Sequence, residues 1–181
     1  MTYCEYLKSI DGEKLALHKE YHDNHYGFPI DDDNELFGRL ILEINQAGLN
    51  WLLILKKQND FRRAFENYDI VKVAAYGPED VDRLLNDKGI IRNKLKIKAA
   101  IMNANIILDL KKEHGSFRNW LKKNSETCYD LEAWKKIFKK TFTFTGGEIV
   151  NEFLMSIGYL PGAHSADCPA YKKIMDLKKK Q

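Results

Sequence analysis

The sequence predicts an all-α fold. Three observations support this prediction: apolar residues recur at helical spacing, capping residues precede several of these segments, and no segment alternates as a strand would. The chain has 181 residues, of which 44% are apolar, so it can form one domain with a sizeable core. The net charge of +3 is too small to indicate a polyanionic partner, so local clusters of charge must decide that question.

The first predicted helix lies in residues 31–46, where acidic residues precede an apolar stripe, as is favourable at a helix N-terminus. Gly48 can adopt the positive φ that ends such a helix. Asn50 can then cap a second helix that runs from Trp51 towards Phe65. This stretch therefore predicts two helices joined by a tight turn.

A third helix is predicted in residues 77–86, because Pro78 suits the first turn of a helix. A long helix is predicted in residues 92–115, where apolar residues recur on one face and Gly115 provides the stop. Shorter helices are predicted in residues 117–121, 131–140 and 148–158.

The cysteines and the N-terminal segment predict a cytoplasmic protein. Three cysteines are too few, and odd in number, for a disulfide framework, so we expect thiols or metal thiolates. Charged residues occur throughout the first 14 positions, which excludes a signal-peptide core, and no apolar run reaches membrane-spanning length. We therefore expect no membrane contact.

A possible metal site begins with His164 and Cys168, which are four residues apart and could supply half of a tetrahedral zinc site. The other half could come from Cys4, His22 and His25 near the N-terminus, so that one metal would join the two ends of the chain. The alternative is that these residues are ordinary surface imidazoles and buried thiols that bind no metal.

Glu43 is a carboxylate on an apolar helical stripe that includes Leu36 and Leu40. Such a position costs desolvation energy unless a cation or a hydrogen-bond donor meets the carboxylate. One interpretation is an ordinary edge glutamate paired with a lysine or arginine. The other is a binding-site acid, with Trp51 facing the same cavity rather than packing in the core.

Residues 88–98 carry five basic side chains and no acid. This stretch could be a solvated helix face. Alternatively, Gly89 lies between two predicted helices, where a hairpin could direct backbone amides at a phosphate group.

Several motifs in the right order resemble the bacterial constitutive 3-methyladenine DNA glycosylase family: YHDNHYGFP, LFGRLILEINQAGLNWLLILKK, GIIRNKLKIKAAIMNA, FTFTGG and the terminal His-x₃-Cys. The resemblance runs from Cys4 to Cys168. It implies a helix-hairpin-helix fold in one domain over residues 1–181, with the two termini joined by a structural zinc ion. The expected parts are a zinc-clip lobe from residues 1–30 and 155–175, and a helix-hairpin-helix lobe over approximately 31–120.

The resemblance also implies the metal ligands. Carried onto this chain, they are Cys4, His22, His164 and Cys168. Four protein ligands leave no position for water, so the expected role of Zn²⁺ is structural. His25 is then a surface or pocket residue.

The activity that the resemblance implies is hydrolysis of the N-glycosidic bond of 3-methyladenine in double-stranded DNA during base excision repair. Glu43 would be the catalytic residue of a pocket for the extrahelical base. The family lacks the catalytic aspartate of related glycosylases, and no strand cleavage is expected. We expect a monomer that associates with the nucleoid when bound to DNA. The base-binding residues would be Tyr21, Trp51, Tyr6 and Tyr26.

The resemblance identifies residues 88–98 as the hairpin that binds DNA. Leu49, at the tip of the Gly48 turn, is the candidate wedge that fills the gap left by the flipped nucleotide. The backbone contacts would come from Gly89, Ile91 and Arg92, and salt-dependent attraction from Lys94 and Lys96.

Departures from the family pattern gather near the predicted pocket and leave the lesion range open. The family commonly has tryptophan where this chain has Tyr6 and Tyr26, and an acid where it has His25; Ile44, Asn45, Asn50, Gly147 and Glu148 also differ. Two alternatives therefore stand beside a 3-methyladenine glycosylase: a non-catalytic module that binds damaged DNA, and a glycosylase with another lesion preference.

Overall fold

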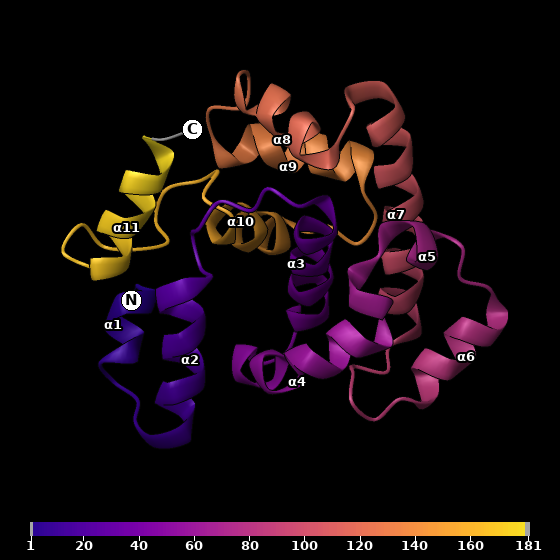
Figure 1. Cartoon of the computed structure of the whole chain (residues 1–181), viewed down its shortest axis with the longest axis horizontal. Helices are drawn as coiled ribbons and strands as arrows, with labels where there is room; N and C mark the ends of the chain where they lie inside the picture. The colour runs from indigo at the N-terminus through magenta and orange to yellow at the C-terminus, as the bar shows by residue number, and fades with distance from the viewer. Residues whose placement is uncertain (1, 180–181) are drawn as a thin grey trace.

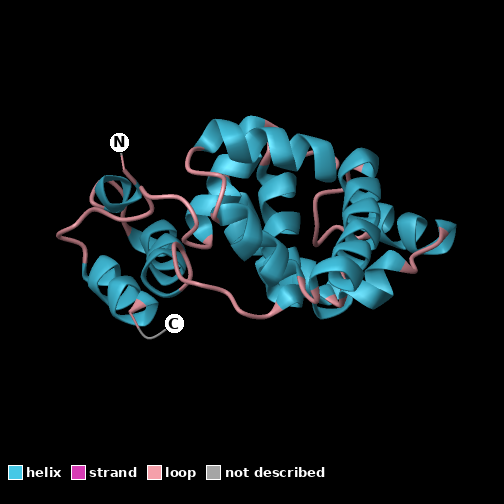
Figure 2. Cartoon of the chain, turned by 90° about the horizontal axis from the view of Figure 1, so that it is seen from above, coloured by secondary structure: helices cyan, strands magenta, loops and turns pink. Residues whose placement is uncertain are grey.

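The computed structural model describes residues 2–179, and the regular secondary structure of this part of the chain is helical (Figures 1 and 2). The all-α prediction is confirmed. The helices are α1 (Tyr3–Leu7), α2 (Gly12–Asn24), α3 (Asp33–Gln46), α4 (Trp51–Ala64), the 3₁₀ turn η1 (Glu66–Tyr68), α5 (Ile70–Ala74), α6 (Pro78–Asn86), α7 (Lys94–His114), α8 (Phe117–Ser125), α9 (Leu131–Thr141), α10 (Gly147–Ser156) and α11 (Pro169–Lys178).

Helix α3 lies at the centre of the molecule, where it contacts α4, α7, α8 and α10 (Figure 1). Its apolar stripe drives this position, because Phe37 and Leu40 are fully buried in the main core. Gly38 faces η1 so closely that a Cβ atom would lie 2.3 Å from the ring of Tyr68. The helix is therefore surrounded on nearly all sides, and any polar residue on it must be explained.

The turn between α3 and α4 has the predicted geometry. Gly48 has a φ of 78°, and the side chain of Asn50 caps α4 by accepting a 2.8 Å hydrogen bond from the amide of Leu52. The amide of Leu49 donates to the carbonyl of Gln46, and the side-chain amide of Gln46 donates back to the carbonyl of Leu49. Leu49 is therefore presented at the tip of a tight, cross-braced turn.

A hairpin over residues 87–93 joins α6 to α7, as the helix-hairpin-helix prediction requires. Asn93 caps α7 by accepting from the amides of Leu95 and Lys96. At Gly89, a Cβ atom would lie 2.9 Å from both Asp60 Cβ and Asp87 Oδ1, so the hairpin needs glycine there for steric reasons. Lys57 Nζ donates to the carbonyl of Lys88 at 2.7 Å, which secures the hairpin to α4.

The terminal lobe, which we define as α1, α2 and α11, stands beside the main helical body and brings the two ends of the chain together (Figures 1 and 2). A small second core of Tyr21, Tyr26, Leu55 and Ala163 lies between this lobe and the body. None of the three helices was predicted from the sequence, nor was the short helix α5.

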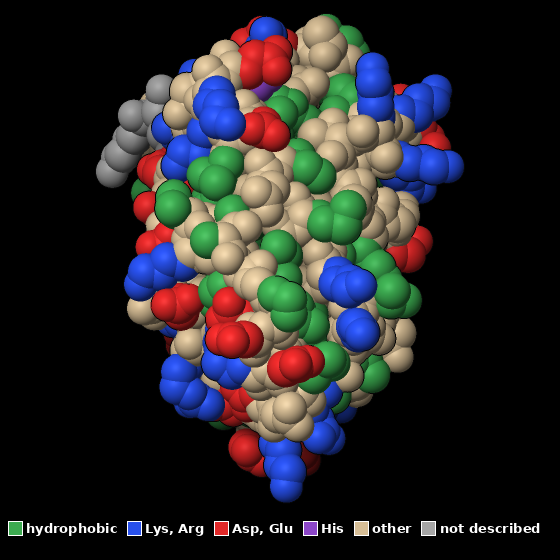
Figure 3. Space-filling model, turned by 90° about the vertical axis from the view of Figure 1, so that its right-hand side faces the viewer, with side chains coloured by type: hydrophobic (Ala, Val, Ile, Leu, Met, Phe, Trp, Pro, Cys, Tyr) green, Lys and Arg blue, Asp and Glu red, His purple; other side chains and the backbone are tan. Residues whose placement is uncertain are grey.

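The face formed by α5, α6 and α7 mixes acidic and basic side chains, with hydrophobic side chains emerging among them (Figure 3). The most exposed apolar residue of α5 is Val71, and the two most exposed apolar residues of α7 are Leu95 and Met102. Among the residues described, no helix is long and apolar enough to cross a membrane.

Candidate base-binding pocket and metal centre

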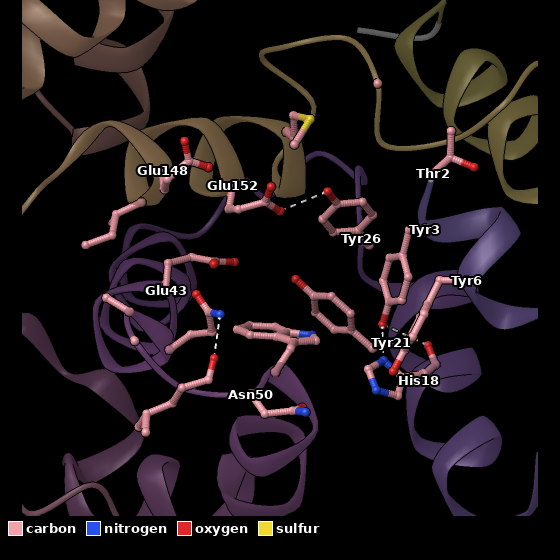
Figure 4. Close-up of a pocket in the computed structure, with 18 residues that line it drawn as sticks. Thr2, Tyr3, Tyr6, His18, Tyr21, Tyr26, Glu43, Asn50, Glu148 and Glu152 are labelled. Carbon is pink, nitrogen blue, oxygen red and sulfur yellow. Dashed lines mark hydrogen bonds between the residues drawn. The ribbon is translucent and has the colours of Figure 1, made fainter. Parts of the chain in front are cut away.

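A cavity of about 800 Å³ opens where the terminal lobe meets α3, α4 and α10 (Figure 4). Its walls contain five aromatic residues and three glutamates, and no lysine or arginine is among the residues that line it. In a protein with a net charge of +3, this composition makes the cavity an acidic and aromatic exception. Such a cavity fits a flat ligand that carries positive charge.

Glu43 projects from α3 into this cavity and is only 3% exposed (Figure 4). Burial raises the pKa of its carboxyl group to about 8; Arg39 opposes this shift and Glu152 adds to it. Within residues 2–179, no ion pair or hydrogen bond is formed by the Glu43 carboxylate, and the Arg39 guanidinium donates instead to the Tyr21 hydroxyl at 2.9 Å. The interpretation of Glu43 as an edge residue paired with a cation is therefore wrong.

Aromatic rings face Glu43 from the terminal lobe and α4. The rings of Tyr21 and Trp51 lie 5.2 Å apart between centroids at an angle of 57°, and those of Tyr21 and Tyr26 lie 5.7 Å apart. Tyr6 lines the same cavity from α1. All four residues predicted to bind the base thus line the same cavity as Glu43.

Several residues that line the cavity were not selected by sequence reasoning, among them Tyr3, His18 and Glu152. His18 Nδ1 lies 2.8 Å from the hydroxyl of Tyr3, while its Nε2 is fully shielded from solvent and has no hydrogen-bond partner within residues 2–179. The spacing of His18, Tyr21 and His22 on one helical face was the available signal. Glu152 gave no such signal, because α10 reaches the pocket only in the folded chain.

Four potential metal ligands, Cys4, His22, His164 and Cys168, gather where the two chain ends meet, with their ligand atoms all within 4.8 Å of one another. Cys4 Sγ lies 3.2 Å from His22 Nε2, and His22 Nε2 lies 3.1 Å from His164 Nδ1. Cys168 Sγ lies 3.6 Å from His164 Nδ1 and 3.9 Å from His22 Nε2. Tetrahedral zinc, with bonds of about 2.3 Å to sulfur and 2.0–2.1 Å to nitrogen, has ligand–ligand separations of roughly 3.3–3.8 Å, so the donor set fits a metal of this kind.

The second nitrogen of each histidine in this cluster is already engaged. His164 Nε2 lies 2.6 Å from the carbonyl oxygen of Tyr26, and His22 Nδ1 lies 2.7 Å from Asp23 Oδ1. These contacts orient His164 Nδ1 and His22 Nε2 towards the two cysteines. His25 is exposed and is not part of the cluster, as predicted. The cluster joins the N- and C-terminal segments, which is consistent with a structural zinc site.

Comparison with known proteins identifies the family. The model of the methyladenine glycosylase family matches residues 12–137. The chain belongs to the methyladenine glycosylase family. It is 37% identical over 172 residues to the DNA-3-methyladenine glycosylase 1 of Escherichia coli K12, covering 86% of this chain and 91% of that protein.

Solved structures of methyladenine glycosylases share the fold. A 3-methyladenine DNA glycosylase I from Staphylococcus aureus superposes with a TM-score of 0.82 at 28% identity, covering 94% of this chain and 98% of that one. A tyrosine-to-phenylalanine variant of 3-methyladenine DNA glycosylase I, solved in complex with 3-methyladenine, superposes with a TM-score of 0.80 at 28% identity over the same shares of the two chains. The resemblance noted from the motifs is confirmed.

The residues predicted to contact DNA in this methyladenine glycosylase occupy two places. Leu49 is 37% exposed at the rim of the cavity. Arg92 and Lys94 are exposed at the hairpin, with Gly89 and Ile91 partly covered.

Lys96 does not lie with the others at the surface. It is 5% exposed, and its Nζ donates to the carbonyl oxygens of Asn45 at 2.8 Å and Ala47 at 2.7 Å. A cation at the carboxyl end of α3 stabilises that helix terminus and the turn that follows. The charge of Lys96 is therefore committed to the turn that carries Leu49.

Proposed function

We propose that this protein is a monofunctional DNA-3-methyladenine glycosylase of base excision repair, which hydrolyses the N-glycosidic bond of the alkylated base and leaves an abasic site. The observation that carries the proposal is the buried, unpaired carboxylate of Glu43 facing Tyr21 and Trp51 in one cavity. Membership of the methyladenine glycosylase family supports the same activity.

The pocket recognises the base through charge and through ring stacking. Alkylation at N3 leaves the adenine of the nucleotide positively charged. The positive charge of the base lowers the pKa of Glu43 as the base enters the pocket, so that the ionised carboxylate attracts the cation and accepts a hydrogen bond from its exocyclic amine. Each aromatic face adds about 0.5–2 kcal/mol of cation–π energy. Unmodified adenine is neutral and gains little from either term.

The reaction follows from the charge of the substrate. As the glycosidic bond breaks, its electron pair moves to the base, which becomes neutral, and the sugar becomes an oxocarbenium-like cation. A water molecule attacks the sugar carbon that carried the base and loses a proton, which completes the hydrolysis. Because the cationic base is a good leaving group, a strong general acid is unnecessary. Asp109, the one acid in the middle of α7, does not serve as one, because it is exposed and forms an ion pair with Lys112. Glu43 contributes by binding and aligning the departing base.

DNA would be bound across the hairpin and the pocket rim. Gly89, Ile91 and Arg92 would contact the phosphate backbone, and Lys94 would add attraction that weakens with salt. Leu49 would enter the duplex as the nucleotide flips, which costs a few kcal/mol. Lys96 supports this wedge indirectly. The protein would act as a monomer on double-stranded DNA.

The metal would be Zn²⁺, bound by Cys4, His22, His164 and Cys168. With four protein ligands it would supply no chemistry to the reaction beyond joining the chain ends. The consequence for the pocket is positional, because His22 shares α2 with Tyr21, and His164 contacts the backbone of Tyr26.

The proposal is tested by incubating the protein with methylated duplex DNA and separating the released bases by chromatography. We expect 3-methyladenine in solution and intact strands with alkali-labile abasic sites. Release of a different base as the main product would indicate another lesion preference. Tight binding to abasic DNA without release of any base would indicate a damage-binding module and would reject the glycosylase.

A further inference from the structure

A second carboxylate faces the pocket from the wall opposite Glu43. Glu152 projects from α10 towards the space that Glu43 enters from α3 (Figure 4). The hydroxyl of Tyr26 donates to Glu152 Oε2 at 3.2 Å, and the side-chain amide of Asn151 lies 3.5 Å from Oε1. Glu152 is therefore oriented by neutral donors and keeps its negative charge available to the cavity.

No lysine or arginine lines the cavity beside this pair of acids. Glu152 forms no ion pair with any residue between positions 2 and 179. The buried Arg39, whose charge acts on Glu43, donates to the Tyr21 hydroxyl and to the carbonyl of Ser156. Burial raises the pKa of Glu152, and the charge of Glu152 in turn contributes to the raised pKa of Glu43. The two carboxylates repel each other across an aromatic cavity, and a cationic ligand bound between them would relieve this repulsion.

We infer that Glu152 is a specificity-determining residue that acts with Glu43 to select bases carrying a positive charge. This inference rests on the proposed base pocket. A cationic purine between the two walls would be attracted from both sides in a region of low dielectric, whereas a neutral purine of the same shape would gain nothing from the second acid.

The same arrangement favours departure of the product. Once the bond has broken, the base is neutral and its attraction to Glu152 is lost, while the steric fit to Tyr21 and Trp51 remains. Glu152 should therefore affect binding of the charged substrate and have a smaller effect on the chemical step. Tyr26 is a positioning residue in this scheme, because its hydroxyl sets the direction of the Glu152 carboxylate.

The inference is tested with two ligands of nearly the same shape and different charge. The 3,9-dimethyladeninium cation keeps the positive charge of the alkylated nucleotide, whereas free 3-methyladenine carries no charge at slightly alkaline pH. Calorimetric titration of the wild type should show tighter binding of the cation. Glu152→Gln should reduce the preference for the cation about fivefold to tenfold, with the affinity for neutral 3-methyladenine changed less than about twofold.

Two controls separate charge from structure. Glu152→Asp keeps the charge on a shorter side chain and should restore most of the preference. Glu132→Gln, on the exposed outer side of α9, should leave both affinities unchanged. In base-release kinetics on methylated DNA, Glu152→Gln should raise KM with kcat changed less than about twofold, as expected for an interaction made on binding.

Each outcome decides between the two proposals. Equal weakening of both ligands by Glu152→Gln would mean that the residue only supports the fold of the pocket, and the inference would be overturned. An unchanged preference in that variant would overturn it as well. In both cases, continued release of 3-methyladenine would leave the proposed function intact. A wild-type protein that binds neither ligand and releases no base would reject the pocket itself.

Discussion

The main helical body and the terminal lobe are built from different kinds of residue. In the body, α3 and its neighbours bury phenylalanine, leucine and isoleucine in one continuous core. In the lobe, the buried residues of α2 are His18, Tyr21 and His22, α1 has none, and α11 buries only Ala170 and Ile174. The body is thus held mainly by the hydrophobic effect, whereas the lobe combines a few apolar residues with potential metal ligands and aromatic contacts. The pocket lies between them: its three glutamates come from α3 and α10 of the body, and most of its aromatic rings come from the lobe.

The body should respond to a core cavity as one cooperative unit. Phe37 is fully buried on α3, and Phe37→Ala should lower the free energy of unfolding by about 3–5 kcal/mol. Urea denaturation followed by circular dichroism measures this change. A loss below about 1 kcal/mol would contradict the central role given to α3.

The lobe should respond to loss of the metal while the body does not. Chelation, or Cys168→Ser, should weaken the lobe by about 2–4 kcal/mol, because metal binding and local folding are coupled. Hydrogen exchange should then increase in α1, α2 and α11, with α3 and α7 still protected, and base release should fall as the lobe rings lose their position.

The matched control for this experiment is Cys128→Ser, since Cys128 is a buried thiol outside the cluster. Elemental analysis of the wild type should give one zinc per chain. Exchange that rises evenly over the whole chain after chelation would remove the distinction between lobe and body.

Lys96 sharpens the comparison from within the body, because it is a buried cation that joins α7 to the end of α3. Lys96→Met should cost about 1–3 kcal/mol of stability by leaving the carbonyls of Asn45 and Ala47 without their donor. Base release should fall as well, because the turn that presents Leu49 loosens. Lys94 is an exposed neighbour, so Lys94→Met should leave stability unchanged and weaken DNA binding only at low salt. If urea denaturation showed a larger loss of stability for Lys94→Met than for Lys96→Met, this role for Lys96 would be refuted.

Glu43 is the residue at which function and stability oppose each other. Its pKa of about 8 in the folded protein lies above the ordinary value of 4.5, so the folded state retains a proton that the unfolded chain releases between these values, and stability falls as pH rises through this range. Glu43→Gln removes this penalty and should stabilise the protein by about 1–2 kcal/mol at alkaline pH, with no gain in acid. Urea titrations at both ends of the range measure this; a gain that is the same at every pH would contradict the assignment.

The sequence predicted the body better than the lobe for a physical reason. The helices around Leu40 and Ile97 carry aliphatic stripes and clear caps, and the structure begins and ends α3, α4 and α7 close to the expected residues. Helix α2 has no such stripe, because its buried face is made of a histidine pair and a tyrosine. The histidines and the tyrosine that line the pocket and the metal cluster therefore also removed the apolar pattern by which α2 could have been predicted.

The site was predictable only in part. Glu43 stood out because it interrupts an apolar stripe, and the metal ligands became recognisable through their place in the family motifs. Glu152 and His18 reach the pocket through tertiary contacts between α10, α2 and α3, which no local pattern encodes. Lys96 was interpreted as one more basic residue of the hairpin, because the sequence around it gives no sign that its Nζ binds the carbonyl oxygens of Asn45 and Ala47.

The most direct test of the account is the rate of 3-methyladenine release by Glu43→Gln in a single turnover on methylated duplex DNA, with circular dichroism confirming that the variant is folded. We predict a loss of about a hundredfold or more relative to the wild type, because the variant loses the charge that attracts and aligns the cationic base. A folded variant that releases 3-methyladenine within about threefold of the wild-type rate would contradict the account, since less than 1 kcal/mol would then depend on that carboxylate.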